Sequence, residues 1–195
     1  MINLTERNIT ETADKVTTEV SYSISESMLW ELIKKFPENK AREEIAAKLL
    51  VIDHLYSTQV FKRAKMSALD ELIDNILAIP NFDERVAKGD TELVPQIYKG
   101  YKRKLFSFAS KYCCLHNTVV YGRDDYSIYD STVHKLLPKY AKEVGIKLTG
   151  AQLEKWRSSG DYKAFNDAVA DLLDKAEIKF EGRRRKFDLF IWEQR

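Results

Sequence analysis

Two residues near the middle of the chain have the chemistry of a reactive site. Lys111 lies in a segment with helical periodicity whose other residues are mostly apolar or small. Lysine is strongly hydrated and rarely enters such surroundings without a partner. Removing an amine from water lowers its pKa and so exposes a neutral lone pair, which a nucleophilic lysine requires. The alternative is that Lys111 lays its methylenes on apolar surface and keeps its ammonium group in water.

Asp130 directly precedes a segment in which apolar residues recur at helical spacing, from Val133 to Val144. Aspartate is a favoured N-cap because its carboxylate accepts a backbone N–H of the first turn. Taken alone, this residue is therefore best interpreted as a helix cap. Its interest comes from its place after the lysine, because the two residues are separated by a helix end and a loop.

The spacing of the pair matches a known arrangement. Lys111 ends the sequence Ser-Phe-Ala-Ser-Lys, and nineteen residues later Asp130 stands in Ser-Ile-Tyr-Asp-Ser-Thr-Val. This succession of helix, loop and capped helix resembles the signature of the helix-hairpin-helix DNA glycosylases, particularly the 8-oxoguanine DNA glycosylase branch. The matching register runs from Leu105 to Val133, and the helical surroundings suit that family's fold over most of the chain.

The resemblance implies a fold, a reaction and a partner. It implies an all-α, helix-hairpin-helix DNA glycosylase-like fold that acts on double-stranded DNA containing a damaged base, such as 8-oxoguanine, without a cofactor. A flipped-out nucleotide would be attacked by neutral Lys111, which displaces the base and leaves a Schiff base. Asp130 would stabilise the positive charge developing on the sugar and help to move protons. The enzyme expected is a glycosylase with lyase activity.

The family's hairpin, usually Leu-Pro-Gly-Val-Gly, corresponds here to Leu105–Ala109. Small residues replace both glycines, and glycine is what lets backbone amides approach a phosphate closely. A basic cluster just before this segment adds a second potential grip on phosphates, against the alternative of a solvated surface. The predicted contacts to the DNA backbone are therefore Lys102, Arg103, Lys104, Ser107 and Ala109. A second basic cluster, at 183–186, is suited to phosphates and equally suited to an acidic partner.

Three further residues are predicted to surround the base, and one to enter the duplex. By resemblance, an aromatic residue of the last helix stacks on the base, which points to Phe190 or Trp192, and Cys114 could line the pocket beside Lys111. Gln59 stands where family members insert a polar side chain to fill the gap left by the flipped base. Stripes at helical spacing are more often core, and a loop at a helix end is the simpler interpretation of Gln59.

The elements that position these residues are predicted to be helices in one domain spanning 1–195. Apolar residues make up 44% of the 195 residues and charged residues 32%, with a net charge of only +2. A polar N-terminal arm is expected over about 1–24, with one short strand or an extended segment at 16–24. Helices are expected to begin at Ser25 or Ser27, at Asn39 and at Ser67. A central helix over 101–116 precedes four more, which begin near 130, 151, 162 and 186.

Other classes of protein fit the sequence poorly. The two cysteines, Cys113 and Cys114, are adjacent and cannot staple a domain by an ordinary disulfide. Neither a signal peptide nor a membrane span is expected, so the cytoplasm is the predicted compartment, with no membrane partner and a monomeric state. No metal site is predicted, because His54 and His134 are isolated. The rival hypothesis is a non-catalytic helical module, retaining the glycosylase-like fold, that binds DNA or a protein; an interaction module with no nucleic-acid role is the third.

Overall fold

The computed structural model describes residues 2–63, 67–101 and 105–195, and every regular element within those ranges is a helix. This confirms the all-α prediction for the described part of the chain. The helices are α1 (Glu6–Thr18), α2 (Val20–Lys35), α3 (Arg42–Leu55), α4 (Val60–Arg63), α5 (Ser67–Ala78), α6 (Phe82–Ala87), α7 (Leu93–Ile97), α8 (Phe106–Tyr121), α9 (Ser131–Glu143), α10 (Gly150–Ser159), α11 (Tyr162–Lys175) and α12 (Arg183–Trp192).

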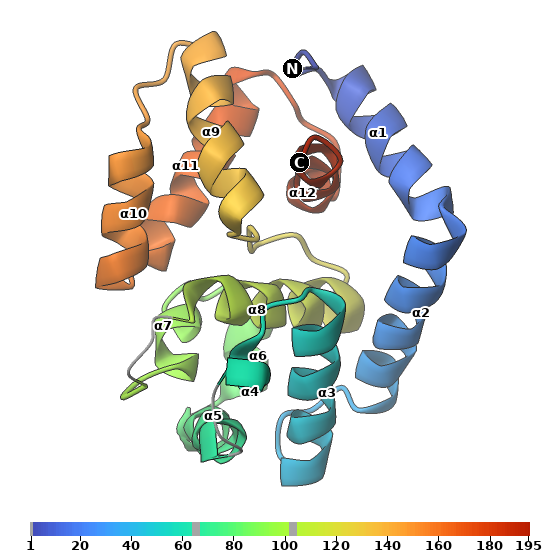
Figure 1. Ribbon diagram of the computed structural model, residues 1–195, viewed down its shortest axis with the longest axis vertical. Coiled ribbons are helices and arrows are strands. Elements are labelled where there is room, and N and C mark those ends of the chain that lie inside the picture. Colours follow the sequence, from blue (N-terminus) through green and yellow to red (C-terminus); the bar gives the residue numbers. More distant parts are fainter. Residues whose placement is uncertain (1, 64–66, 102–104) are drawn as a thin grey trace.

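Helix α8 crosses the middle of the molecule, with α3 to α7 on one side and α9 to α12 on the other (Figure 1). It packs against α2, α3, α6 and α7. The helices α1 and α2 follow one another along the edge of the molecule and connect the two sides, because α1 packs on α12 while α2 reaches α3 and α8. The last helix is therefore held by the first.

The central position of α8 follows from its composition. Apart from Ser107, each residue from Phe106 to Asn117 is buried, including the large side chains of Phe108 and Tyr112. A helix that is apolar or small on all sides belongs in the core of a domain. Lys111 is part of this run, so its position in the sequence forces it into the interior.

The N-terminal prediction was wrong in its secondary structure. Residues 16–24 form neither a strand nor an extended arm, but the end of α1 and the start of α2, separated at Glu19 by one residue of extended backbone. Thr5 caps α1, and Ile9, Ala13 and Val16 recur at helical spacing on its buried face. The weak alternation over 16–24 came from two helical faces meeting at that break.

Three predicted helix starts and one predicted end also moved. Helix α2 begins at Val20, and the hydroxyl of Ser25 bonds back to a carbonyl within the helix instead of capping it. Helix α3 begins at Arg42, because Asn39 is buried and its amide and backbone N–H bond to Asp83. The central helix begins at Phe106 and continues to Tyr121, where Gly122 adopts the left-handed conformation that ends it.

No helix in the described ranges is both long enough and apolar enough to cross a membrane.

Candidate active site

Lys111 is buried in the second turn of α8, with 4% of its surface exposed. Its Nζ lies 2.9 Å from the Ser107 hydroxyl, one turn earlier, and 5.7 Å from the centre of the Tyr56 ring. Lys48 provides a comparison, because it is also buried but donates to the carbonyls of Phe36 and Glu38 and to the Asn39 side chain, at 2.8–3.0 Å. Lys48 thus has three acceptors for its ammonium group, although burial lowers its pKa to about 8. Among the described residues, Lys111 has one hydrogen-bond partner, the Ser107 hydroxyl.

Burial lowers the pKa of Lys111, and the nearby carboxylates of Asp130 and Asp188 oppose that shift. The direction is the one that an amine nucleophile requires, because the neutral form then exists closer to neutral pH. The charge of Arg185 acts in the same direction as burial.

Asp130 is the N-cap of α9, as its sequence predicts. Its Oδ1 accepts the backbone N–H of Val133 at 2.8 Å. The preceding residue, Tyr129, donates its backbone N–H to the hydroxyl of Ser110, at 3.1 Å. Since Ser110 and Tyr129 are the immediate chain neighbours of Lys111 and Asp130, this hydrogen bond fixes the start of α9 directly beside the lysine.

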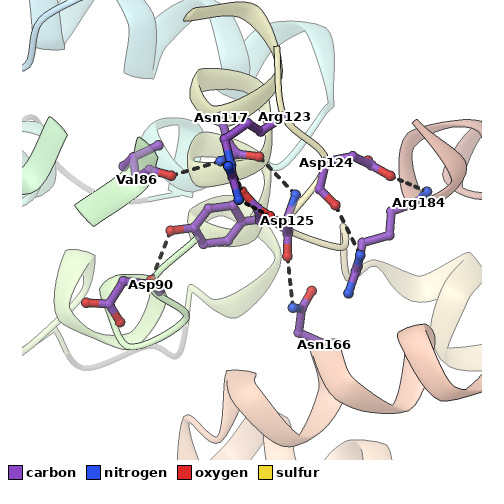
Figure 2. A network of polar contacts seen from close by, with 9 residues as sticks. Val86, Asp90, Asn117, Arg123, Asp124, Asp125, Asn166 and Arg184 are labelled. Carbon is purple, nitrogen blue, oxygen red and sulfur yellow. Dashed lines mark hydrogen bonds and ion pairs between the residues drawn. The ribbon is translucent and has the colours of Figure 1, made fainter. Parts of the chain in front are cut away.

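The rest of the loop between α8 and α9 is held by a polar network (Figure 2). Asn117 on α8 donates to Asp125 at 2.9 Å and accepts the Asp125 backbone N–H at 3.0 Å. Asp124 accepts the backbone N–H groups of Arg184 and Arg185, and so caps α12 from outside that helix. The chain also approaches closely at Gly89, where φ is +71° and an added Cβ would lie 2.6 Å from Asp125 Cβ. One loop thus positions both α9 and α12 relative to α8.

Lys111 and Asp130 line the same cleft, whose volume is about 780 Å³. The first turn of α8, the loop after α3 and the start of α9 form most of its walls, and Arg157 and Trp192 close it. A second branch of about 740 Å³ shares Tyr56, Lys111, Asp130 and Trp192, and extends between α2 and α12.

The second branch borders a charge cluster that the sequence did not reveal. Arg185, whose side chain is 10% exposed, bonds to Asp188 and to Glu26, each at 2.5 Å, and to the Tyr22 hydroxyl at 2.7 Å. Tyr56 lies 3.4 Å away through its hydroxyl. Burial raises the pKa of Asp188 to about 6 against the opposing charge of Arg185. The sequence signal was only the pattern Arg185-x-x-Asp188, within a basic cluster that was expected to meet phosphates or an acidic partner.

The rest of the second basic cluster is also used internally. Arg183 pairs with Asp174, Arg184 donates to the Asp124 carbonyl, and Lys186 lies 3.3 Å from Asp14. These contacts hold α12 to α1, to α11 and to the loop before α9. The cluster at 183–186 is therefore part of the fold.

Of the three residues predicted to surround a base, the structure brings only Trp192 into the cleft. Phe190 is fully buried against Tyr140 and Phe187, and Cys114 is buried one turn along α8 from Lys111 without lining either branch. Neither Phe190 nor Cys114 can contact a ligand in the cleft. On α12, the face that carries Phe190 packs in the core, whereas Trp192 faces the cleft.

Of the DNA-backbone contacts predicted in the hairpin, the structure also brings only some to the cleft. Residues Phe106–Ala109 are the first turn of α8 and not a hairpin turn, and Ala109 is fully buried, so it cannot touch a phosphate. Ser107 lines the cleft and contacts Lys111. The predicted phosphate-binding residues Lys102, Arg103 and Lys104 lie outside the described ranges.

Gln59 belongs to the loop that follows α3, at the edge of the cleft. Its φ is +55° and that of Ser57 is +49°, both left-handed. Asp53 fixes this loop by accepting the backbone N–H groups of Val60 and Phe61 at 2.7 and 3.2 Å. Ser57 and Thr58 line the cleft, whereas Gln59 stands beside it.

No cluster of three or more metal-ligating side chains occurs within the part of the chain that is described.

Comparison with known proteins assigns a family. We found no significant match among solved structures. An uncharacterized protein of Haemophilus influenzae is 26% identical over 154 residues, which cover 77% of this chain and 65% of that protein. This chain thus matches about two thirds of the length of that curated relative. The model of HI_0787_N, described as an N-terminal domain, matches residues 8–125, which include Lys111 but not Asp130. Because the match covers more than half of the chain, the protein belongs to the HI_0787_N family.

Proposed function

We propose that the protein is a DNA glycosylase with associated AP-lyase activity, which excises an oxidised purine such as 8-oxoguanine through a Schiff base on Lys111. The observation that carries the proposal is that the buried amine of Lys111 and the carboxylate of Asp130 line one cleft. Its volume, about 780 Å³, lies within the range of small-molecule sites and suits one extruded nucleotide.

The amine has the surroundings of a nucleophile. Burial lowers its pKa, and Ser107 contributes the hydroxyl that orients it. In the proposed reaction the Lys111 lone pair forms a bond to C1′ of the deoxyribose as the bond from C1′ to the base breaks. The departing base takes the electron pair and receives a proton. Asp130 stabilises the positive charge that develops on the sugar before the new bond is complete.

The lyase step follows from the same adduct. Opening of the sugar ring converts the Lys111–C1′ adduct to an imine, and loss of a proton from C2′ expels the 3′ phosphate. Water then hydrolyses the imine and returns the amine of Lys111. The carboxylate of Asp130 is the group in the cleft suited to carry these protons.

The walls of the cleft support binding of a polyanion at its mouth. Arg157 and Arg195 line it from two sides, and the first turn of α8 opens into it through Leu105, Ser107 and Phe108. The positive end of the α8 helix dipole lies at that turn and favours phosphate oxygens.

Borohydride trapping tests the proposal. The protein is incubated with a duplex containing 8-oxoguanine opposite cytosine, and with a duplex containing an abasic site. Sodium borohydride is then added, and covalent adducts are separated by size. We expect an adduct with both duplexes, its loss in Lys111→Ala, and its retention in the control Lys163→Gln, which changes an exposed lysine on α11. Thermal unfolding of each variant establishes that it is folded.

The absence of an adduct with either duplex, or an adduct that persists in Lys111→Ala, would reject the catalytic proposal. Salt-dependent binding of undamaged duplex without trapping would favour the rival hypothesis, a non-catalytic binding module.

A further inference from the structure

The second branch of the cleft, between α2 and α12, borders a cluster in which two carboxylates share one guanidinium. Arg185 donates to Glu26 and to Asp188, and Glu26 itself lines the branch. The side chains of Glu26 and Asp188 are only 15% and 12% exposed. Two carboxylates of low exposure thus share the single positive charge of Arg185. Buried negative charge without matching cations favours a ligand that donates hydrogen bonds.

Glu26 is the member of this cluster that is both fixed and accessible from the branch. It lines the cavity together with Tyr22, Tyr56 and Trp192, whereas Arg185 and Asp188 lie behind it. One of its oxygens, Oε1, bonds to Arg185 at 2.5 Å. A carboxylate has two oxygens with lone pairs on each, so Glu26 keeps acceptor capacity that Arg185 does not use. The guanidinium thereby holds the carboxylate in one orientation.

The walls beside Glu26 are partly aromatic. The ring centres of Tyr22 and Trp192 lie 5.8 Å apart, and both residues line the branch. The guanidinium of Arg195 stacks on Trp192, 3.6 Å from the indole centre, and fixes that ring. Aromatic walls with a few polar groups are typical of sites for small ring-containing ligands.

We infer that Glu26 is a specificity-determining residue that selects a guanine-type over an adenine-type edge of the base, an inference that rests on the proposed function. The edge of a guanine-type base presents two adjacent donors, N1–H and the N2 amino group, to the carboxylate. An adenine-type edge presents one amino donor beside the N1 lone pair, which is repelled by the second oxygen. A buried site built for hydrogen bonding discriminates strongly, because the wrong edge leaves its polar groups unpaired.

The variant Glu26→Gln tests this inference. Glutamine has nearly the same shape and keeps an oxygen for Arg185, but it replaces an acceptor with an amino donor. We expect excision of 8-oxoguanine to fall about 100-fold or more relative to 8-oxoadenine. Trapping on an abasic duplex, which has no base to recognise, gives the reference rate, because it reports any effect of the change on Lys111 through Arg185. Glu193→Gln is the matched control, because Glu193 lines the same branch but pairs with the exposed Lys15.

Two further measurements separate this inference from the proposed chemistry. Binding of free 8-oxoguanine and 8-oxoadenine by calorimetry reports base selection whether or not Lys111 is a nucleophile. The variant Glu26→Asp keeps the charge but withdraws it from the branch, so it should lose most of the preference if Glu26→Gln does not fold. Wild-type preference in both variants, in excision or in binding, would overturn the assignment of Glu26. Absence of trapping in the wild type would instead reject the proposed function, and the binding measurement would still test base selection by Glu26.

Discussion

At the scale of single residues, Asp130 combines two tasks that a substitution can separate. It caps α9 through the Val133 N–H and presents a carboxylate to the cleft that contains Lys111. The first task needs only an oxygen that accepts a hydrogen bond, and the second needs a negative charge. Asparagine supplies the oxygen without the charge, and alanine supplies neither.

We therefore expect Asp130→Asn and Asp130→Ala to differ in stability but to agree in activity. The free energy of unfolding should stay nearly unchanged in the first and fall by about 1 kcal/mol in the second. Trapping rates should fall about 100-fold or more in both, because charge stabilisation is lost. Urea denaturation and single-turnover trapping measure the two quantities. Equal activity in the wild type and Asp130→Asn would limit Asp130 to its structural task.

At the scale of elements, the site depends on how α9 is registered against α8. The bond from the Tyr129 backbone to Ser110 joins the two helices next to Lys111 and Asp130. Ser110 is fully buried, and its hydroxyl also donates to the Ser107 carbonyl. Ser110, next to Lys111, thus connects the start of α9 to the buried part of α8.

The variant Ser110→Ala should be less stable and should hold the start of α9 less precisely against α8. Its buried Tyr129 N–H would be left without a partner, at a cost of about 1–3 kcal/mol in the free energy of unfolding. We expect trapping on the abasic duplex to slow at least tenfold even where the variant is fully folded, because misplacement of catalytic groups is costly. The control is Ser27→Ala, an exposed serine that bonds only within α2. A folded Ser110→Ala variant with wild-type trapping would show that this hydrogen bond does not position the site.

At the scale of the whole molecule, His116 couples stability to pH. It is 1% exposed in the core, and its Nδ1 lies 3.0 Å from the Tyr112 carbonyl oxygen. Burial lowers its pKa from 6.5 to about 3, so the folded protein keeps this ring neutral. The unfolded chain binds a proton as the pH falls through 6.5, whereas the folded protein does so only near 3. Stability from this group is therefore complete above pH 6.5 and is lost progressively below it.

We expect the free energy of unfolding to fall by about 2 kcal/mol between pH 7.5 and pH 5 through His116 alone. The variant His116→Gln should lack this contribution, so its stability should change less over the same interval. His54→Gln, which changes an exposed histidine, should keep the wild-type dependence. Urea denaturation at several pH values measures all three proteins. Identical pH dependence in wild type and His116→Gln would contradict the assignment.

The sequence predicted what depends on neighbours along the chain. Periodic apolar residues located most of the helices, and the position before an apolar helix identified Asp130 as a cap. The sequence also placed Lys111 in an apolar helix. The structure brings Lys111 and Asp130 to one cleft. The glycosylase-like fold and activity stay predictions.

What the sequence could not predict depends on contacts between distant segments. Arg185 meets Glu26 across 159 positions of the chain, and no local pattern encodes such a meeting. Phe190 and Trp192 share one helix, but their opposite environments were decided by how α12 packs. Helix α1 and the first turns of α2 were missed because α1 is stabilised mainly by its contact with α12, at the other end of the chain.

The contact between the first and last helices means that the cleft is completed late in synthesis of the chain. The chain emerges from the ribosome N-terminus first, so Lys111 is synthesised well before α12. Until α12 arrives, the cleft lacks Trp192, and Lys111 lacks the nearby charge of Arg185. We therefore expect the proposed reactivity of Lys111 to depend on docking of the last helix on the first.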